Sequence, residues 1–375
     1  MRKLLVTCDY PPITGGQASY FSCIWSNLNS ENCLLLVPKA CKKGWKGNVS
    51  QVRFMPIASG ENWPARITRF ILLTIHVLKA CVAFKPEEIQ FGQFIVGGLC
   101  GILIKFIRGT EFICFCHGTD ILEFSRNGIG RIIVKKILRS CKKVAANSTF
   151  TAQSIRQIAP AAVEIINPGV DTKFFSHNAA LTEQLYERFR VSGTQVILTA
   201  GRLVERKGHD AVIKALPLIA ETVPDIHYVI VGDGPYRKPL EKIAAESAAA
   251  GRVTFCGKVS DEELCSYYRL AKIFIMVPRY LIARGDIEGF GIVYLEANAA
   301  GLPVIAAKSG GVEDAVQHGE NGLLVTNPES IEEISTAVCT LLTDAKLHAT
   351  LSAQALKWAQ QRRCHNAQNI WAEKL

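Results

Sequence analysis

Short apolar runs of strand length recur along this chain, and a longer segment of helix-like composition follows most of them. The first set spans residues 3–167 and consists of KLLVT, CLLLV, QVRFM, EIQFG, FICFC, KVAANS and VEIIN. Helix-like segments such as 64–84 and 129–140 lie between them. This alternation predicts a parallel sheet, because a helix is needed to carry the chain back to the edge where the next strand begins. We therefore expect an α/β domain with helices on both faces of a doubly wound sheet.

The alternation pauses after NPGVD (167–171) in a polar, weakly patterned segment and then begins again. The second set of runs consists of TQVILTAGR, DIHYVIVGDG, RVTFCGK, KIFIMVP, LPVIAA and GLLV. A chain of 375 residues has room for two domains of ordinary size. We expect an amino-terminal domain over residues 1–170 and a second domain over residues 171–357. A helical tail at about 358–375 is expected to pack back on the first domain.

The 13 cysteines lie mostly inside apolar runs. The opening MRKLLVTCDYPP has too short an apolar run for a signal peptide, and glutamines and glycines interrupt the longest uncharged stretch, 89–104. We therefore interpret the cysteines as reduced thiols that pack as small apolar side chains. Cys114, Cys116 and His117 cluster, but no second ligand pair at zinc spacing follows them, so a metal site is disfavoured.

The net charge of +10 is unevenly distributed. Residues 1–180 contain 22 Lys and Arg against 10 Asp and Glu, a balance of +12, and the remaining residues balance at −2. A basic half favours an anionic partner such as nucleic acid, an acidic lipid surface or a phosphorylated substrate. The absence of a helix-turn-helix, zinc-finger or RNA-binding motif counts against nucleic acid. The first strand leads into DYPPITGG rather than G-x-G-x-x-G, which counts against a dinucleotide-dependent oxidoreductase.

A basic loop follows the first strand of the second set. In TAGRLVERKGHD (199–210), the strand ends in glycine, the cations Arg202, Arg206 and Lys207 follow, and another glycine opens a helix. Fixed cations at the carboxyl end of a strand, beside a helix amino terminus, form a site for a diphosphate. A solvated basic loop is the alternative. The glycines of VGDGPYR (231–237) fit either a tight turn or a ligand-binding loop.

Two glutamates, Glu288 and Glu296, lie eight positions apart in GDIEGFGIVYLEANAAGLPVIA (285–306). Glu288 precedes a glycine-rich turn whose backbone can approach a ligand closely, and the helix that starts near Gly291 directs free N–H groups at a phosphate. Glu296 lies about one and a half turns into that helix. One carboxylate can bind the hydroxyls of a sugar ring and the other those of a ribose. With phosphates held by Arg and Lys, this is the chemistry of a nucleotide-sugar site.

The stretch E-G-F-G-I-V-Y-L-E (288–296) resembles the glutamate–seven–glutamate motif of the retaining glycosyltransferases of family four. The resemblance extends through G-R-L-V-E-R-K-G (201–208), V-G-D-G-P (231–235), S-G-G-V-E-D-A-V (309–316) and the first loop, C-D-Y-P-P-I-T-G-G-Q-A-S-Y (8–20). In motif form the chain is most similar to phosphatidylinositol mannosyltransferases and related mannosyltransferases. The resemblance implies the α/β GT-B fold, in which two Rossmann-like doubly wound parallel-sheet domains face a cleft.

The resemblance also implies a role for each residue that matches a family motif. The residues expected to act in catalysis are His117, Arg202, Lys207 and Glu288. The residues expected to bind the donor are Gly16, Arg202, Lys207, Lys258, Val259, Glu288, Phe290, Gly291, Ile292 and Glu296. The two cations would hold the diphosphate, Glu288 the transferred sugar and Glu296 the ribose, with Lys258 and Val259 lining the base pocket. The residues expected on the acceptor side are Gly15, Gln17 and Asp120.

The implied activity is transfer of a hexose, with mannose favoured, to a lipid-linked or polysaccharide-precursor acceptor in cell-envelope glycan synthesis. GDP-mannose is favoured over a UDP-sugar as the donor. No metal is expected, although Asp286 and Glu288 form a D-x-E pair, because cations neutralise the diphosphate in this fold. No carboxylate is evidently placed for double displacement, so the acceptor is expected to attack from the leaving-group side. A non-hydrolysing sugar-nucleotide epimerase of the same fold and an inactive family member are the alternatives.

The segment RIIVKKILRSCKK (131–143) combines basic and apolar residues at helical spacing. Its cations are Arg131, Lys135, Lys136, Arg139 and Lys142, and the apolar residues between them are Ile132, Ile133, Ile137 and Leu138. Together with the apolar segments 64–84 and 94–107, it predicts peripheral docking on the anionic inner face of the cytoplasmic membrane, where a lipid-linked acceptor would lie. An ordinary surface helix whose apolar face packs on the sheet is the alternative.

Overall fold

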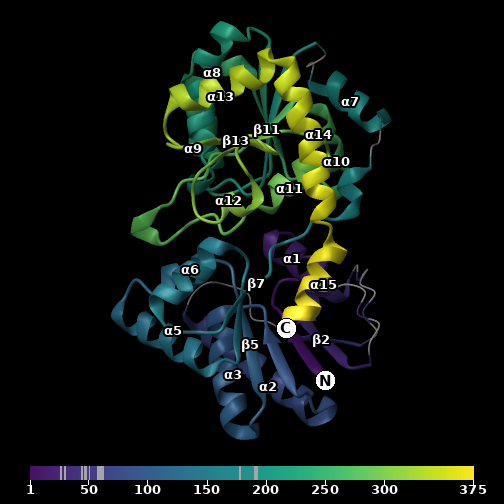
Figure 1. Cartoon of the computed structure of the whole chain (residues 1–375), viewed down its shortest axis with the longest axis vertical. Helices are drawn as coiled ribbons and strands as arrows, with labels where there is room; N and C mark the ends of the chain where they lie inside the picture. The colour runs from purple at the N-terminus through teal and green to yellow at the C-terminus, as the bar shows by residue number, and fades with distance from the viewer. Residues whose placement is uncertain are drawn as a thin grey trace. The chain divides into compact units, whose positions relative to one another are not determined.

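The chain forms two compact units (Figure 1). Unit 1 comprises Met1–Gly169 and Cys364–Leu375, and unit 2 comprises Val170–Arg363. The computed structural model describes residues 1–25, 28, 31–43, 45, 49, 51–56, 63–176, 179–189 and 193–375. Part of the polar segment expected after NPGVD, including residues 177, 178 and 190–192, lies outside the described residues.

Unit 1 is built on a seven-stranded sheet with the order β3-β2-β1-β4-β5-β6-β7, in which every neighbouring pair is parallel. The strands are β1 (Lys3–Val6), β2 (Cys33–Pro38), β3 (Val52–Met55), β4 (Glu88–Phe91), β5 (Glu111–Cys116), β6 (Lys143–Ala146) and β7 (Val163–Ile165). They are short, and most of their side chains are buried, as expected for a parallel sheet covered on both faces. The predicted doubly wound parallel architecture is therefore confirmed for this unit.

Helices cover both faces of this sheet. They are α1 (Gly16–Trp25), α2 (Trp63–Phe84), α3 (Phe94–Arg108), α4 (Thr119–Phe124), α5 (Gly128–Ser140), α6 (Thr149–Ile158) and α15 (Cys364–Lys374), with a 3-10 turn at Lys39–Lys42. On one face, α2, α3 and α5 pack beside one another over a single apolar core. On the other face, the Trp25 ring of α1 stacks on Phe21 at 4.5 Å and meets Phe115 of β5 edge-on at 5.4 Å.

The carboxyl-terminal helix α15 packs beside α1 in unit 1 (Figure 1). Trp371 is buried, and its indole N–H donates a hydrogen bond to Oε1 of Gln90 on β4 at 2.8 Å. The Lys3 ammonium lies 4.8 Å from the centre of the same indole ring. The carboxyl terminus is therefore fixed on the central strands of the first sheet. The break between α14 (Ala345–Gln361) and α15 divides the tail into two helices.

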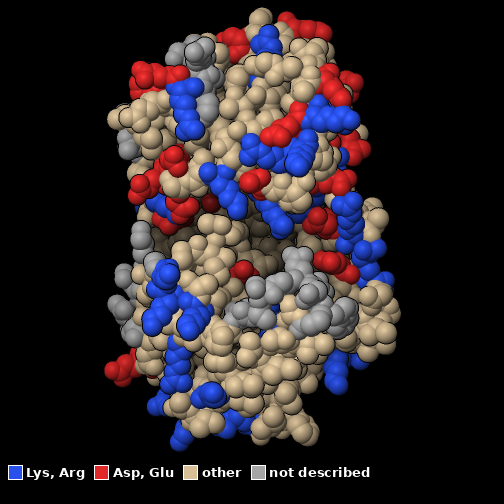
Figure 2. All heavy atoms as spheres, turned by 180° about the vertical axis from the view of Figure 1, so that it is seen from behind, with Lys and Arg blue, Asp and Glu red and all other residues tan. Residues whose placement is uncertain are grey.

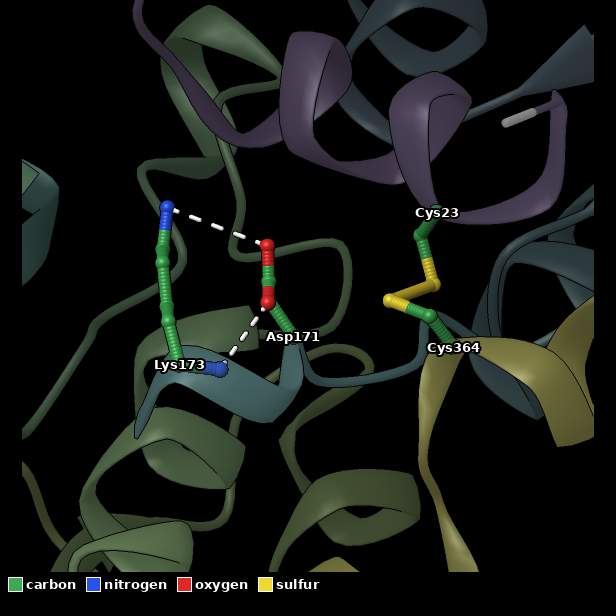
Figure 3. The surroundings of a disulfide bond; sticks show 4 residues. All are labelled: Cys23, Asp171, Lys173 and Cys364. Carbon is green, nitrogen blue, oxygen red and sulfur yellow. Dashed lines mark hydrogen bonds and ion pairs between the residues drawn. A yellow bond between two sulfur atoms is a disulfide. The ribbon is translucent and has the colours of Figure 1, made fainter. Parts of the chain in front are cut away.

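A disulfide joins Cys23 of α1 to Cys364 at the start of α15 (Figure 3). This corrects the interpretation of all cysteines as thiols, because these two residues are 341 positions apart and their Cα atoms lie 4.8 Å apart. The other eleven cysteines, all among the described residues, are not disulfide-bonded. Most of the cysteines of unit 1 outside the disulfide are buried, and burial raises their thiol pKa, to about 12 for Cys100. Those thiols do pack as small apolar side chains.

We expect protein purified without reductant to release eleven titratable thiols on denaturation and 13 after reduction. Cys364→Ser should lower the free energy of unfolding of unit 1 by roughly 3–5 kcal/mol, because a long closed loop restricts the unfolded chain. Cys339→Ser, which removes a free thiol on another helix, is the matched control. Thiol titration and denaturant unfolding measure the two effects, and 13 thiols without reductant would contradict the crosslink.

Unit 2 has a six-stranded parallel sheet with the order β10-β9-β8-β11-β12-β13. The strands are β8 (Gln195–Ala200), β9 (Ile226–Val231), β10 (Val253–Gly257), β11 (Ile273–Ile275), β12 (Val304–Ala307) and β13 (Gly322–Val325). The helices are α7 (Ala179–Phe189), α8 (His209–Thr222), α9 (Arg237–Glu246), α10 (Asp261–Leu270), α11 (Ile292–Ala299), α12 (Val312–Ala315), α13 (Ile331–Thr343) and α14. Four short 3-10 turns complete the unit at Thr172–Phe175, Glu205–Lys207, Ala250–Arg252 and Ile282–Arg284.

Alternate side chains of the unit 2 strands enter two separate cores, one on each face of the sheet. On β8, Val196 and Leu198 join one core, and Ile197 joins the other. Consecutive side chains of a strand point to opposite faces, so both cores are filled from the same strands. The two-domain Rossmann-like fold predicted from the alternation of strands and helices is confirmed by both sheets.

Among the described residues, one helix is long and apolar enough to cross a membrane. It is α2, whose window Ile67–Phe84 has a mean hydropathy of 1.8. The face of α2 that carries Leu73 and Val77 packs on the sheet of unit 1, and 28% of the window is buried. The uncharged stretch 89–104 consists of most of β4, a turn and the larger part of α3.

Candidate nucleotide-sugar site

Two loops of unit 2 meet at the point where the strand order of its sheet reverses. The loop 201–208 follows β8, and the loop 276–291 follows β11, the neighbouring strand on the other side of the reversal. In open parallel sheets, ligands bind outside the carboxyl ends of the strands at this point, because the two connections diverge there to opposite faces. The sheet topology therefore brings the basic loop and the Glu288 loop together.

The close approach of these loops requires glycine at position 208. Gly208 has a φ of 75°, and a Cβ atom there would lie 2.0 Å from the carbonyl oxygen of Val277. A backbone hydrogen bond of 2.8 Å from the Arg279 N–H to the Arg206 carbonyl joins the loops directly. A side chain at position 208 would separate them, so the K-G pair in the sequence has a steric cause.

The loops exchange charges in a compact cluster that consists of Arg206, Lys207, Asp286 and Glu288. Glu288 Oε2 lies 2.5 Å from Arg206 Nη1 and 2.6 Å from Lys207 Nζ. Arg206 Nε lies 2.9 Å from Asp286 Oδ1. Burial alone would raise the pKa of Glu288, but the Lys207 and Arg206 cations outweigh it and hold the pKa at about 2. Glu288 is therefore an anion at every physiological pH and a weak base.

Lys207 is buried with Glu288. Burial lowers the pKa of Lys207, and the Glu288 carboxylate opposes that effect. Arg202 lies earlier in the same loop, is exposed, and forms no ion pair with any described residue. Among the described residues, the loop therefore presents one unpaired cation, Arg202, and two cations, Arg206 and Lys207, whose partners are carboxylates.

The turn Ser309–Gly311 holds the backbone of Glu288 in place. The Gly311 N–H donates to the Glu288 carbonyl at 2.9 Å. Gly310 has a φ of 61°, and a Cβ atom there would lie 2.4 Å from that same oxygen. The S-G-G-V-E-D-A-V segment is therefore part of the support for Glu288, a role that sequence spacing alone does not reveal.

The turn after Glu288 leads into α11. Gly291, with a φ of 90°, is the residue before the helix, and Ile292 is its first residue. The Phe290 side chain is buried in a core of unit 2. The polar groups that Phe290 and Gly291 can offer a ligand are therefore those of their backbone. The first N–H groups of α11 have no carbonyl partner within the helix, as at every helix start.

Glu296 lies inside α11 and is buried. Its Oε2 accepts a hydrogen bond of 2.8 Å from the Tyr268 hydroxyl on α10. Burial raises the pKa of Glu296 to about 7, against the lowering effects of the Tyr268 hydrogen bond and of the Lys173 cation. Lys173 itself lies 2.6 Å from Asp261, and its backbone N–H donates to Asp171 (Figure 3).

The two expected base-pocket residues follow β10. Lys258 is exposed and Val259 is half-buried against one core of unit 2. Ser260, the next residue, caps α10 with a reciprocal hydrogen-bond pair to Glu263. Lys258 and Val259 lie at the carboxyl end of the sheet because they directly follow β10. The cap at Ser260 fixes the start of α10 immediately after them.

The expected residues of unit 1 also follow strand ends. Gly15 and Gly16 are exposed where the loop after β1 enters α1, and Gln17 is half-buried in the first turn. A Cβ atom at either glycine would meet nothing within 4 Å. This loop is fixed to the end of β4 by Gln93, which accepts from the Cys8 N–H at 2.8 Å and donates to Asp9 at 3.0 Å.

His117 directly follows β5. Its ring meets the rings of Tyr20 and Phe21 edge-on, with ring centres 5.4 and 5.5 Å away. Burial lowers the pKa of His117 to about 4, so the imidazole is neutral at physiological pH. Its Nε2 atom is buried without a hydrogen-bond partner among the described residues. An unsatisfied buried nitrogen at a strand end marks a position where a ligand group can bind.

Asp120 has a local role that the sequence did not reveal. Its carboxylate accepts hydrogen bonds from the backbone N–H groups of His117 and Ile121. Burial raises the pKa of Asp120 to about 6, although these hydrogen bonds act in the opposite direction. The side chain therefore shapes the turn that carries His117.

Sequence reasoning missed three site residues: Arg206 as a partner of Glu288, and Tyr268 and Lys173 beside Glu296. Arg206 lies next to Lys207 in the motif, so the sequence indicates that it lies near the site. Nothing in the spacing of the motif indicates that it pairs with Asp286 or Glu288. Tyr268 and Lys173 lie on other segments and give no local signal.

Comparison with known proteins identifies the family. The model described as Glycosyltransferase Family 4 matches residues 40–174, and the model described as Glycosyl transferases group 1 matches residues 183–358. A relative from Mycobacterium tuberculosis, 32% identical over 363 residues, is named GDP-mannose-dependent alpha-(1-6)-phosphatidylinositol monomannoside mannosyltransferase. The alignment covers 95% of this chain and 93% of the relative. The chain belongs to glycosyltransferase family 4.

A further relative supports this assignment, and solved structures match the fold. A Mycolicibacterium smegmatis protein of the same name is 31% identical over 95% of this glycosyltransferase and 93% of the relative. Anabaena HepE in complex with UDP matches 100% of this chain and 99% of its own with a TM-score of 0.80 and 22% identity. WaaG, a glycosyltransferase involved in lipopolysaccharide biosynthesis, matches 99% and 98% of the two chains with a TM-score of 0.72 and 18% identity. These structural matches confirm the GT-B fold. The predicted enzyme class, a glycosyltransferase, is confirmed by the family.

The raised pKa of Glu296 predicts a pH dependence for nucleotide binding to this glycosyltransferase. Only the carboxylate form accepts two hydroxyl hydrogen bonds from a ribose, so GDP affinity should rise with pH as the carboxyl group ionises near pH 7. Because the terminal phosphate of GDP also titrates, with a pKa of about 6, the informative quantity is the difference from Glu296→Gln. Calorimetry over about three pH units around neutrality, from about pH 5.5 to 8.5, measures this difference. Parallel pH curves for both proteins would contradict a ribose role.

Proposed function

We propose that this glycosyltransferase moves mannose from GDP-mannose to a lipid-linked phosphatidylinositol mannoside, with retention of anomeric configuration. The observation that carries the proposal is the buried Glu288 beside Lys207 at the reversal point of the unit 2 sheet. The Glu288 carboxylate can accept hydrogen bonds from sugar hydroxyls, and Lys207, with its Nζ 2.6 Å from Glu288 Oε2, is a cation that can bind phosphate. The names of the relatives, which are 31–32% identical over 95% of the chain, support mannose, GDP and the lipid acceptor.

The donor is proposed to lie along the carboxyl ends of β8, β11 and β10. Arg202 and Lys207 bind the diphosphate and stabilise the leaving nucleotide, because both cations follow β8 and one is unpaired among the described residues. Glu288 accepts hydroxyls of the mannose. Its Oε2 binds both cations, which leaves Oε1 for the sugar.

The backbone and the helix start complete the proposed donor site. The N–H groups of Phe290, Gly291 and Ile292 provide uncharged donors where α11 begins. Glu296 binds the ribose. Lys258 and Val259 line the base pocket, partly through their backbone groups, since both lie between β10 and the capped helix α10.

Unit 1 is proposed to supply the acceptor side. Gly15 and Gly16 leave the start of α1 open to a ligand, because neither has a side chain there, and Gln17 adds a polar side chain in the first turn. A neutral His117 donates or accepts a single hydrogen bond through Nε2 to a sugar hydroxyl, and it does not act as a cation. Asp120 holds the turn beneath it.

A front-side mechanism suits these groups better than double displacement. Glu288, with a pKa of about 2, is a poor general base. In the proposed step, the acceptor hydroxyl oxygen bonds to the anomeric carbon as the bond from that carbon to the phosphate oxygen breaks. The acceptor proton passes to the departing phosphate. The protein contributes orientation and charge stabilisation.

We propose that the reaction needs no metal. The two carboxylates of the D-x-E pair already have cation partners, because Asp286 binds Arg206 and Glu288 binds Arg206 and Lys207. A metal ion would have to displace these cations from both carboxylates. Charge compensation of the diphosphate then rests on Arg202 and Lys207.

The test of function uses GDP-mannose and phosphatidylinositol monomannoside in detergent, with and without excess EDTA. A mannosylated lipid should form in both conditions, and UDP-glucose should be a poorer donor. The anomeric configuration of the new linkage, read by NMR, tests retention. Interconversion of a sugar nucleotide without acceptor would instead support the epimerase, and loss of activity in EDTA with rescue by magnesium would overturn metal independence.

Variants of the proposed clamp give a second measure in the same assay. Arg202→Ala and Lys207→Ala should each reduce kcat/KM by the equivalent of about 2–4 kcal/mol, because each removes a cation from the leaving diphosphate. Lys214→Ala, on the exposed face of α8, is the matched control and should leave turnover unchanged. Near-normal turnover of both clamp variants would remove these residues from the mechanism.

We further propose that unit 1 docks on an anionic membrane. The structure corrects the composition of the expected surface: Ile137 and Leu138 of α5 are buried in the core, as in the alternative interpretation. Ile129 and Ile132 of the same helix are instead 76% and 68% exposed. The adjacent helices α2 and α3 add exposed apolar side chains, which are Ile67, Ile71, Ile75, Val82, Leu103, Phe106 and Ile107.

Cations accompany this apolar surface. Lys135, Lys136 and Arg139 line a shallow depression beside Ile132 on α5. On the face drawn in Figure 2, Lys and Arg predominate over Asp and Glu in unit 1. Exposed aliphatic and aromatic groups flanked by cations are typical of surfaces that insert into the headgroup layer of a bilayer.

Vesicle sedimentation tests docking. Binding to vesicles that contain an anionic phospholipid should exceed binding to neutral vesicles and weaken with salt, because each cation near the surface contributes about 1 kcal/mol. The double variant Lys136→Glu/Arg139→Glu should reduce binding at least about tenfold. Lys238→Glu/Lys242→Glu, on α9 of unit 2, is the charge-matched control. Equal binding to both vesicle types would leave α5 as an ordinary solvated face.

A further inference from the structure

We propose that Arg206 is a positioning residue. It compensates the negative charges of Asp286 and Glu288, so that Lys207 can turn to the donor diphosphate. This inference rests on the proposed function, in which Lys207 binds phosphate. It assigns to Arg206 a role distinct from that of the two phosphate-binding cations. Arg206 itself does not touch the donor in this arrangement.

The contacts of Glu288 define the problem that Arg206 solves. Arg206 and Lys207 bind the same atom, Glu288 Oε2, at 2.5 and 2.6 Å. While Lys207 Nζ stays in contact with Glu288, the carboxylate offsets its charge and weakens its attraction to the phosphates. If Lys207 left without a substitute, Glu288 would be a buried carboxylate with no cation, which is strongly unfavourable.

The charge balance shows that Arg206 is the substitute. Two cations, Arg206 and Lys207, face two carboxylates, Asp286 and Glu288, so the cluster is neutral. When Lys207 turns to the diphosphate, Arg206 remains between both carboxylates. Arg206 then neutralises part of the charge of both carboxylates. Solvent screens the remaining negative charge at Asp286, whose side chain is 30% exposed. The buried member, Glu288, keeps its direct contact.

The shape of arginine suits this position and that of lysine does not. Arg206 uses Nε for Asp286 and Nη1 for Glu288, two N–H groups of one planar guanidinium. A lysine ammonium is a single point charge on a flexible chain and cannot hold two carboxylates in a fixed geometry. Asp286 orients the guanidinium, and the Arg279 N–H bond to the Arg206 carbonyl fixes its backbone.

A second ion pair between the same two loops provides a control. Arg284 Nη1 lies 2.9 Å from Glu205 Oε2, and the Arg284 side chain is 66% exposed. This pair joins the loops without touching Glu288 or Lys207. Arg284→Gln therefore removes an inter-loop contact of similar type while leaving the charge cluster intact.

The test measures binding of GDP and of GMP by calorimetry to Arg206→Gln, Arg206→Lys, Asp286→Asn and Arg284→Gln. If Arg206 frees Lys207, Arg206→Gln should weaken GDP binding by about tenfold or more and GMP binding by less than about threefold. The reason is that Lys207 stays on Glu288 and no longer serves the second phosphate. Arg206→Lys should not restore GDP affinity, Asp286→Asn should cause a smaller loss in the same direction, and Arg284→Gln should change neither.

Three outcomes separate the possibilities. Equal losses for GDP and GMP, or a lowered melting temperature that accounts for both, would show that Arg206 only maintains the loops and would overturn the inference. Unchanged GDP binding in Arg206→Gln would overturn it as well. Failure of the unaltered protein to bind GDP would refute the proposed donor site itself, and the inference with it. Asp286→Asn, which removes the contact that orients the Arg206 guanidinium, gives the same comparison if Arg206→Gln does not fold.

Discussion

The compensation of one buried carboxylate organises the site in unit 2. Glu288 lies in a glycine-rich turn from which water is largely excluded, and a carboxylate there is stable only with cations in direct contact. Lys207 and Arg206 provide that contact from the loop after β8, while the Gly311 N–H holds the Glu288 backbone from the turn before α12. Three segments distant in sequence are thus fixed relative to one another by the requirements of a single charge.

The sheet determines which segments can meet there. In the order β10-β9-β8-β11-β12-β13, the connections after β8 and β11 leave toward opposite faces, so their first residues diverge around a common point. The seven-stranded sheet of unit 1 reverses in the same way between β1 and β4, where Gln93 joins the two loops. In each unit, the candidate site residues therefore lie at the carboxyl edge of the sheet, and the apolar cores lie on the faces of the sheet.

The sequence was sufficient for those features that depend on local pattern. The alternation of strands and helices predicted both parallel sheets, and segments 64–84 and 129–140 correspond to α2 and α5 within one residue. Contacts between distant segments could not be predicted. Neither the Cys23–Cys364 disulfide nor the Arg206–Asp286 pair has a local signal, because each depends on which loops the finished fold brings together. The burial of Ile137 and Leu138 depends in the same way on which side of α5 faces the sheet.

The two glutamates that are eight positions apart show how surroundings decide the chemistry of identical side chains. Both are buried, and burial raises the pKa of each. At Glu288 two cations on one oxygen reverse that effect, whereas at Glu296 the partner in direct contact is the neutral Tyr268 hydroxyl, which lowers the pKa only in part. Glu288 thus remains charged and accepts hydrogen bonds, but it cannot take up a proton at neutral pH. In a displacement at the sugar, the acceptor proton must then go to another group, and the departing phosphate is the base that the proposed donor itself supplies.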